Sequence, residues 1–211
     1  DIMNDLMSFG IHRFWKNDLI NLMNPGKNKV LVDVACGTGD ITKLFFDKSD
    51  ISNHAFCLDP NKGMIEKAKN KLKNYNNLKF LIGTAEKLPI KNNTCDYYVI
   101  SFGLRNTKNL DKSISEAYRV LKKGGRFLCL EFSKIQNDNL NFIYKKYSSL
   151  IPIIGNYVIG NREPYEYLIK SIENFINQEE LLDLLVKYKF ENCQYRNLSG
   201  GIVSIHSGWK I

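Results

Sequence analysis

The chain has 211 residues, of which 44% are hydrophobic and 25% charged, ordinary values for one globular domain with a buried core. Its five scattered cysteines include no Cys-x-x-Cys pair, so neither a disulfide framework nor a zinc site is predicted, and no apolar run is long enough to span a bilayer. The net charge of +8 fits attraction to an anionic membrane or nucleic acid, but the codon usage of an AT-rich genome also explains it, so charge alone excludes neither.

The first half of the chain alternates between strand and helix patterns. Residues 3–23 have helical apolar spacing, interrupted near Gly10, and Asn24-Pro25-Gly26 predicts a stop. The pattern then predicts strands at 29–35, 54–59, 78–83, 96–101 and 126–132. Helices are predicted at 40–49, 61–74 and 110–122, the last closed by the basic turn and glycines of 122–125. Strands and helices that alternate in this way indicate βαβ units and a parallel sheet.

The second half predicts extra helices and a terminal hairpin. Residues 138–160 are rich in aromatic and branched apolar side chains, and 165–175 and 178–188 have helical spacing. Two strand candidates, 190–197 and 201–208, are joined through Ser199-Gly200-Gly201. We therefore expect an α/β three-layer sandwich with a mixed seven-stranded sheet, forming one domain over residues 1–211. Within it, residues 1–23 are expected to be lid helices and residues 138–188 a helical insertion over the substrate.

The stretch from Asp33 to Asp40 is the strongest signal for a ligand. An apolar strand ends in a loop with Gly37 and Gly39 and then meets a helical pattern, which is how α/β folds hold a nucleotide-like ligand. A pyrophosphate prefers bare N–H groups and positive charge there, so two flanking carboxylates favour a cationic ligand. S-adenosylmethionine (SAM) carries both a sulfonium and an ammonium, and we predict a SAM site.

Residues at the ends of the following strands extend this site. Asp59 closes the second strand, where an acid accepts hydrogen bonds from ribose hydroxyls, although it could instead begin a helix that Pro60 opens. A dinucleotide-binding enzyme would share this acid, but its third glycine is replaced by Thr42. Single loop residues at strand ends are often only turn residues. Their recurrence after successive strands predicts cofactor contacts at three further positions, namely Thr84, Ala85 and Ser101.

The loop of residues 103–107 follows the fourth strand, where a methyl acceptor would lie. Arg105 and Asn106 could orient a substrate oxygen and stabilise developing negative charge. The alternative is a solvated arginine that pairs with a nearby acid, and the loop sequence alone does not choose between them.

Taken together, these segments resemble the ubiquinone/menaquinone biosynthesis C-methyltransferases (the UbiE family). The resemblance covers nearly the whole chain, with Cys36 standing where some members have Gly. It rests on these segments: residues 3–8 with Gly10, 12–16 (His-Arg-Phe-Trp-Lys), 33–40 (Asp-Val-Ala-Cys-Gly-Thr-Gly-Asp), 101–106 (Ser-Phe-Gly-Leu-Arg-Asn), 131–133 (Glu-Phe-Ser), 165–172 and 197–208.

The resemblance implies methyl transfer from SAM to a ring carbon of a polyprenylated benzoquinol, without a metal. SAM contacts would fall on Thr38, Asp59, Thr84, Ala85 and Ser101. Arg105 would stabilise the phenolate or organise a proton-accepting water, since guanidinium is a poor base, and Asn106 would hold a ring oxygen. His12 and His206 titrate in a suitable range, but single histidines are more often structural.

Partners and location follow from the same resemblance. The polyprenyl tail would be housed by residues 142–160 and the helix around 3–23, with peripheral contact to a membrane, possible homodimerisation and association with other ubiquinone-biosynthesis proteins. The expected site is the matrix side of the mitochondrial inner membrane, or the cytoplasm if the source is bacterial. The sequence does not begin with Met, so we expect an N-terminal segment to have been removed.

Several alternatives stay open at this stage. The acceptor could be a demethylmenaquinol or another small molecule, since the fold does not determine it. An RNA methyltransferase would suit the charge, but the motifs of base-modifying enzymes are missing and the basic residues are dispersed, so no nucleic-acid partner is expected. A non-catalytic scaffold is disfavoured because the glycine loop is intact.

Overall fold

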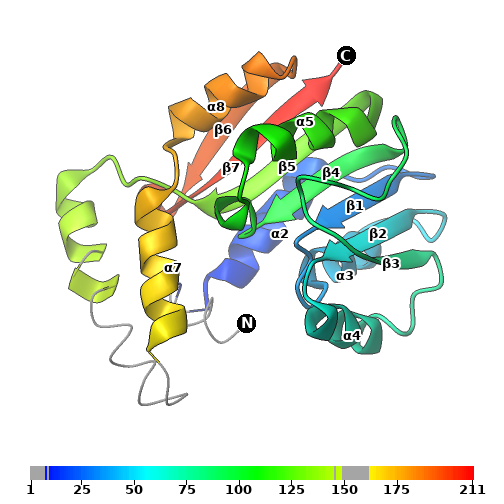
Figure 1. The fold of residues 1–211 in the computed structure, drawn as a ribbon, viewed down its shortest axis with the longest axis horizontal. Coiled ribbons are helices and arrows are strands. Elements are labelled where there is room, and N and C mark those ends of the chain that lie inside the picture. Colours follow the sequence, from blue (N-terminus) through cyan, green and yellow to red (C-terminus); the bar gives the residue numbers. More distant parts are fainter. Residues whose placement is uncertain (1–7, 9, 145, 149–161) are drawn as a thin grey trace.

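A computed structural model describes residues 8, 10–144, 146–148 and 162–211, and they form one central sheet. Its strands are β1 (Val30–Val34), β2 (His54–Asp59), β3 (Leu78–Ile82), β4 (Cys95–Ser101), β5 (Leu121–Phe132), β6 (Glu191–Leu198) and β7 (Val203–Lys210). The order is β3-β2-β1-β4-β5-β7-β6. Strands β1 to β5 pair in parallel, whereas β7 is antiparallel to both neighbours, which confirms the predicted mixed seven-stranded sheet (Figure 1).

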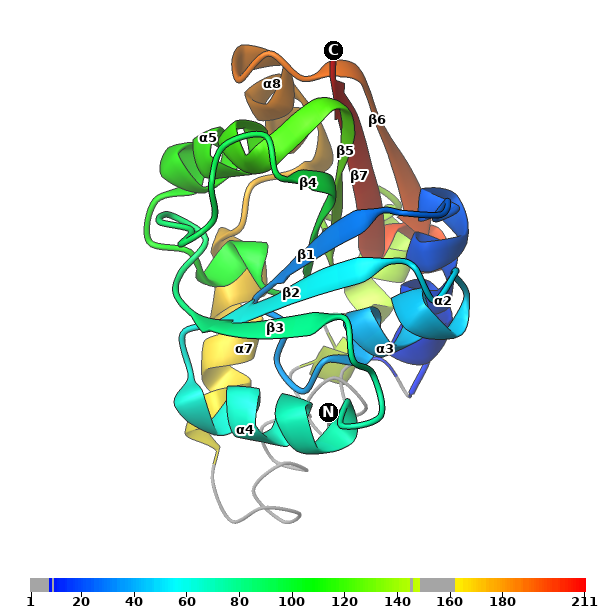
Figure 2. The ribbon, with the colours of Figure 1, turned by 90° about the vertical axis from the view of Figure 1, so that its right-hand side faces the viewer.

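Helices cover both faces of the sheet and make a three-layer sandwich. The helices are α2 (His12–Met23), α3 (Asp40–Asp47), α4 (Lys62–Lys71), α5 (Leu110–Val120), α7 (Glu163–Asn174) and α8 (Gln178–Lys187), with short 3-10 turns η1 (Leu104–Asn106) and η2 (Ser199–Gly201). Figure 2 shows α2 and α3 on one side of the sheet and α5 and α8 on the other. Most of these bounds closely follow the predicted ones.

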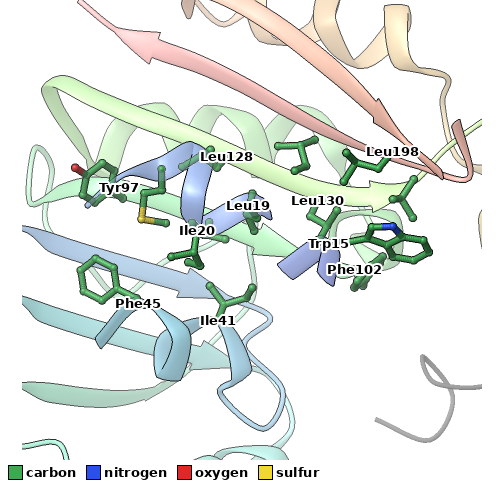
Figure 3. Packing of buried hydrophobic residues seen from close by; sticks show 14 of the residues in the cluster. Trp15, Leu19, Ile20, Ile41, Phe45, Tyr97, Phe102, Leu128, Leu130 and Leu198 are labelled. Carbon is green, nitrogen blue, oxygen red and sulfur yellow. The ribbon is translucent and has the colours of Figure 1, made fainter. Parts of the chain in front are cut away.

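The helix α2 packs directly on the sheet. Its Trp15, Leu19 and Ile20 are buried against Leu128 and Leu130 of β5 (Figure 3). Burying such side chains contributes roughly 1.5–3 kcal/mol each, so α2 is anchored in the core layer. Residues 1–7 and 9 of the expected lid lie outside the described residues, and the lid function of 1–23 stays a prediction.

The predicted terminal hairpin is present. Leu198 pairs with Val203 across η2, and Gly200 and Gly201 have φ of +70° and +94°, angles that favour glycine. The hairpin adds β7 beside β5 and leaves β6 at the sheet edge. The same two glycines that marked the turn in the sequence therefore close it in the structure.

The expected end of the helix over 110–122 was wrong. Helix α5 ends at Val120, and β5 already begins at Leu121, which pairs with Cys95 of β4. Glycines 124 and 125 therefore lie within β5 and do not close the helix. The carbonyl oxygens of Arg119 and Val120 accept instead from the backbone amides of Asn93 and Thr94. Lys210 of β7 completes the helix end, since its Nζ donates to the carbonyl oxygens of Tyr118 and Leu121, each at 2.8 Å.

The region after β5 is helical where it is described. Residues 138–144 and 146–148 are helical, and α7 and α8 match the expected helices at 165–175 and 178–188. Residues 149–160, to which most of the predicted tail channel belongs, lie outside the described residues. No helix in the described part of the chain combines the length and apolarity needed to cross a bilayer.

The Lys210 contact is testable by removing the charged donor. Lys210→Met should lower the free energy of unfolding by about 2 kcal/mol, because buried carbonyl oxygens lose a charged hydrogen-bond donor. Urea denaturation of the variant and the wild type measures this difference. Exposed Lys123→Met is the control and should leave stability nearly unchanged; equal effects at both positions would refute the capping role.

Candidate active site at the carboxyl edge of the sheet

A cavity of about 910 Å³ opens where the parallel strands end. Because these strands run in one direction, their carboxyl ends meet at one edge of the sheet, where ligands of open α/β sheets bind. The structure brings most of the predicted cofactor residues to the wall of this cavity: Asp33, Gly37, Thr38, Asp59, Thr84, Ala85 and Ser101. Gly39 does not line it.

The two glycines of the loop after β1 have different functions. Gly37 has φ of +56°, and no described atom lies within 4 Å of where a Cβ would be, so this position leaves open space beside the backbone. Gly39 has φ of +83° and is the N-cap of α3. A Cβ on Gly39 would lie 2.7 Å from Cδ1 of Leu72. Gly39 therefore permits close packing of the loop against Leu72 at the end of α4. Gly37 leaves room for a ligand.

Asp59 ties the glycine loop to the end of β2. Its Oδ2 accepts a hydrogen bond from the Gly37 amide at 2.9 Å, and its Oδ1 accepts one from the Asn61 amide at 2.8 Å. The N-cap of α4 is Asn61, whose side chain accepts from the amides of Gly63 and Met64. The helix-capping alternative for Asp59 is thus filled by Asn61, and the Asp59 carboxylate stands at the cavity wall beside the loop.

Asp33 is an almost fully buried acid, 1% exposed. Its Oδ2 accepts hydrogen bonds from the Thr42 hydroxyl at 2.8 Å and from the Thr42 amide at 3.2 Å. Burial raises the pKa of Asp33 to about 7, with the Thr42 hydrogen bonds opposing the rise. Its carboxyl group therefore titrates near neutral pH. Thr42, which broke the dinucleotide fingerprint, is the residue that orients this acid.

Asp40 lies in the first turn of α3, next to the Gly39 N-cap. Its carboxylate forms ion pairs with Lys16 of α2, at 2.7 Å, and with Lys71 of α4. Burial opposes ionisation, but the two lysines outweigh it and hold the pKa of Asp40 at about 2. The sequence argument counted Asp40 among the carboxylates that favour a cationic ligand. The structure shows that two lysines of the chain already pair with Asp40, so it adds little net negative charge to the cavity.

The end of β4 carries a buried side-chain hydroxyl that forms no hydrogen bond with the described residues. The Oγ of Ser101 is buried and has no hydrogen-bond partner among them, although it lies at the cavity wall. A buried hydroxyl without a partner is costly, so its presence at a cavity indicates a ligand or water partner. This observation supports the prediction that Ser101 faces a bound molecule.

Two strained residues flank the same edge and were not predicted. Ala35 after β1 has φ of +54°, and Phe102 after β4 has φ of +55°, angles unusual for both residue types. A Cβ on Gly103 would lie 2.5 Å from the Ala35 Cβ, so the two loops are in direct contact. Such strain gathers at functional sites. In the sequence, Gly103 is the one residue of this contact whose type indicates an unusual backbone position.

The structure separates Arg105 from Asn106. Arg105 is buried: its Nη1 donates to Oε1 of Glu131 at 2.7 Å, and its Nε donates to Oγ of Ser171 on α7 at 3.2 Å. It lines a second cavity of about 460 Å³, not the first. Asn106 lines the first cavity. Of the two alternatives weighed from the sequence, Arg105 pairs with an acid, but inside the protein and not in solvent.

His206 lies in a structural setting. Its Nε2–H donates to the carbonyl oxygen of Gln178 at 2.9 Å. Burial lowers the pKa of His206 to about 4, so the imidazole is neutral at physiological pH. The structural interpretation given for this histidine is supported.

Comparison with known proteins assigns the chain to a family. The model of the ubiE/COQ5 methyltransferase family matches residues 1–210. The chain belongs to the ubiE/COQ5 methyltransferase family. It is 49% identical to "Ubiquinone/menaquinone biosynthesis C-methyltransferase UbiE" of Rickettsia akari, over 100% of this chain and 88% of that protein. It is 42% identical to the mitochondrial "2-methoxy-6-polyprenyl-1,4-benzoquinol methylase" of Dictyostelium discoideum, over 100% and 77%.

Solved structures agree on the fold. A SAM-dependent methyltransferase from Thermotoga maritima aligns with a TM-score of 0.68 at 20% identity, covering 99% of this chain and 92% of that one. One from Methanococcus maripaludis, described as putative, gives 0.68 at 19% identity, covering 100% and 90%. Together with the sheet order, this likeness confirms the predicted methyltransferase fold of the ubiE/COQ5 member described here.

The unpartnered Ser101 hydroxyl gives a test within this family site. Ser101→Ala should leave the free energy of unfolding of the ligand-free protein unchanged, or raise it by up to about 1 kcal/mol, because no hydrogen bond is lost. Ser113, whose hydroxyl donates to the Asn109 carbonyl at 3.0 Å, is the matched control, and Ser113→Ala should be destabilising. Chemical denaturation compares the two; equal losses would show that Ser101 is bonded within the protein.

Proposed function

We propose that this chain transfers a methyl group from SAM to a ring carbon of a polyprenylated benzoquinol in ubiquinone biosynthesis. The observation that carries the proposal is the full-length match to ubiE/COQ5 relatives, one of which is named a polyprenyl-benzoquinol methylase. It is supported by the cavity at the carboxyl edge of the sheet, whose walls carry the residues that the sequence assigned to a methyl donor.

A second candidate acceptor is a demethylmenaquinol. The Rickettsia relatives are named for both ubiquinone and menaquinone biosynthesis, so their names cover a naphthoquinol ring as well. Both acceptors place a hydroxyl next to the ring carbon that is methylated, and the same chemistry serves both. An RNA or another small-molecule acceptor has no comparable support.

Different residues of the cavity wall suit different parts of a SAM molecule. Asp59 is a carboxylate at the end of β2, where it can accept hydrogen bonds from ribose hydroxyls. Thr84 and Ala85 border the space for the adenine, and the unpartnered Ser101 hydroxyl offers a hydrogen bond near the centre. Gly37 leaves backbone space next to Thr38. Gly39 contributes by shaping the loop and not by contact.

Methyl transfer from this site needs alignment more than covalent help from the protein. Bound SAM supplies a methyl group on a positively charged sulfur. The acceptor hydroxyl would lose its proton, and the adjacent ring carbon would bond to the methyl carbon as the methyl carbon–sulfur bond breaks and S-adenosylhomocysteine leaves. Loss of the proton from that ring carbon and return of a proton to the oxygen would then restore the quinol, with one proton released overall. The protein must hold the ring carbon in line with the methyl group. We assign Asn106, at the cavity wall, to hold a ring oxygen.

Arg105 acts in this proposal through the loop that carries Asn106. Its buried ion pair with Glu131 of β5 and its hydrogen bond to Ser171 of α7 tie the loop after β4 to these two elements. The Tyr167 hydroxyl donates to Oδ1 of Asn106 at 3.3 Å, which orients the amide. A direct role for Arg105 in stabilising a phenolate would require the acceptor to reach the second cavity.

Location and partners complete the proposal. We place the protein at the matrix side of the mitochondrial inner membrane, or in the bacterial cytoplasm, because the relatives are Rickettsia and mitochondrial proteins. Exposed Phe142 and Ile143, with Lys146 nearby, suit peripheral contact with lipid. Other ubiquinone-biosynthesis proteins and a second copy of the chain are the proposed protein partners, and nucleic acid is not.

Quinone analysis tests the proposed reaction. Depletion of the protein in its source should accumulate a quinone lacking one methyl group, detected by mass spectrometry, and the wild-type chain should restore the methylated form. Asp59→Ala should restore it poorly, because SAM binding is weakened. A menaquinone precursor in place of the ubiquinone precursor would select the second acceptor; unchanged quinones of both kinds would refute the proposal.

Asp33 predicts how SAM binding depends on pH. Its pKa is about 7, and a bound cation favours its carboxylate, so binding of SAM releases a proton below pH 7. The SAM dissociation constant should therefore rise as pH falls from 7 toward 5.5, by up to about tenfold per unit, and should level off above pH 8. Isothermal titration should show that the SAM dissociation constant of Asp33→Asn does not change with pH in this way. A wild-type dissociation constant that stays constant from pH 5.5 to 8 would contradict the prediction.

A further inference from the structure

Phe102 is a bulky residue with a rare backbone conformation in the wall of the active-site cavity. Its φ is +55°, in the left-handed region that residues other than glycine, asparagine and aspartate seldom adopt. It lies between Ser101 and Gly103, and all three residues line the cavity. A strained residue at a cavity is a candidate for contact with a ligand.

Backbone hydrogen bonds hold Phe102 in this conformation. Its amide donates to the carbonyl oxygen of Leu130 on β5 at 2.8 Å. Its own carbonyl oxygen accepts from Nη1 of Arg105 at 2.7 Å, and this arginine is itself held by its buried ion pair with Glu131. Because both polar groups of its backbone are bonded to buried partners, Phe102 cannot relax without losing a hydrogen bond, and its side chain has a fixed place.

The ring of Phe102 packs against two other aromatic rings. Its centroid lies 5.0 Å from that of Phe132 on β5 and 6.3 Å from that of Trp15 on α2, and Figure 3 shows Trp15 and Phe102 next to each other. Phe132 and Trp15 are not part of the described cavity wall, whereas Phe102 is. Among the described residues of that wall, Phe102 is the one aromatic residue.

Phe102 lies at the boundary between the two loops that border the proposed reaction. The glycine loop after β1 and the loop after β4 are in direct contact there, since a Cβ on Gly103 would lie 2.5 Å from the Cβ of Ala35. In the proposed function the first loop borders the methyl donor, and the second carries Asn106, which is assigned to the acceptor ring. The transferred methyl group has to lie between donor and acceptor, which places it beside the start of the second loop.

The sulfonium group of a methyl donor needs a particular kind of neighbour. It carries a full positive charge but no N–H or O–H group, so ordinary hydrogen bonds cannot recognise it. The face of an aromatic ring is negative and attracts a cation, more strongly where water is excluded. A carboxylate in contact with the methyl group would also attract the charge, but its lone pairs could take up the methyl, and a phenyl ring has no such lone pair.

We propose that the ring of Phe102 binds the sulfonium of SAM and strengthens binding of this charged donor relative to S-adenosylhomocysteine, the neutral thioether that remains after transfer. This inference rests on the proposed function, since it adds one contact to the same ligand. The two molecules share their adenine, ribose and amino-acid groups and differ by the methyl group and its positive charge. An attraction that depends on this charge is lost on transfer, which favours release of the product.

The test compares the dissociation constants of SAM and S-adenosylhomocysteine by isothermal titration at pH 8, above the pKa of Asp33, which is about 7. A trifluorinated phenylalanine in place of Phe102 keeps the shape of the ring but withdraws negative charge from its face. It should weaken SAM binding roughly 3- to 30-fold and leave the dissociation constant of S-adenosylhomocysteine nearly unchanged. Phe102→Tyr should keep the wild-type ratio of the two constants, because it retains an electron-rich ring.

Phe132 is the matched control, since its ring packs against Phe102 but is not part of the described cavity wall. The same trifluorinated residue at position 132 should leave both dissociation constants near their wild-type values. Fluorination of Phe102 that weakens both ligands equally, or neither, overturns the inference, and so does an equal selective loss from fluorination of Phe132. Failure of the proposed function would be seen instead as a wild type that binds neither compound.

Discussion

The hydrogen bond from the Gly37 amide to Asp59 is the constraint on which the site depends. It joins the loop after β1 to the end of β2, two segments that parallel pairing already places side by side, with Val34 next to Leu58. The bond needs an acid at the end of one strand and a glycine with open space at the end of the other. Because each carboxylate oxygen of Asp59 accepts from one backbone amide, of Gly37 and of Asn61, each oxygen keeps a lone pair for a ligand.

A buried ion pair between Arg105 and Glu131 holds the loop after β4, which carries Asn106. Arg105 and Glu131 are 6% and 1% exposed at their side chains, and Glu131 also accepts from the backbone amide of Arg105 at 3.3 Å. Truncating one member of such a pair strands the other charge. A loss of activity after substitution of Arg105 therefore has a structural cause available, and only a readout that separates folding from turnover can assign the arginine to the chemistry.

The sequence predicted the sheet, most helix bounds and the strand-end residues, because these follow from local apolar periodicity and from the common direction of parallel strands. It failed where distant residues decide. The glycines at 124 and 125 indicated a helix end, but pairing of Leu121 with Cys95 and the donors of Lys210 set the boundary. Lys16, which lies 24 positions before Asp40, could not be assigned to the site from local pattern.

The two loops that border the site meet at strained backbone positions. Ala35 begins the glycine loop after β1, and Phe102 begins the loop after β4 that carries Asn106. Both residues have positive φ, and Gly103 has no room for a side chain against Ala35. Strained residues persist only where their surroundings hold them. Here Arg105 holds the loop after β4, since its Nη1 also donates to the Phe102 carbonyl at 2.7 Å. The close approach of Gly103 to Ala35 therefore sets the glycine loop directly against the segment that places Asn106.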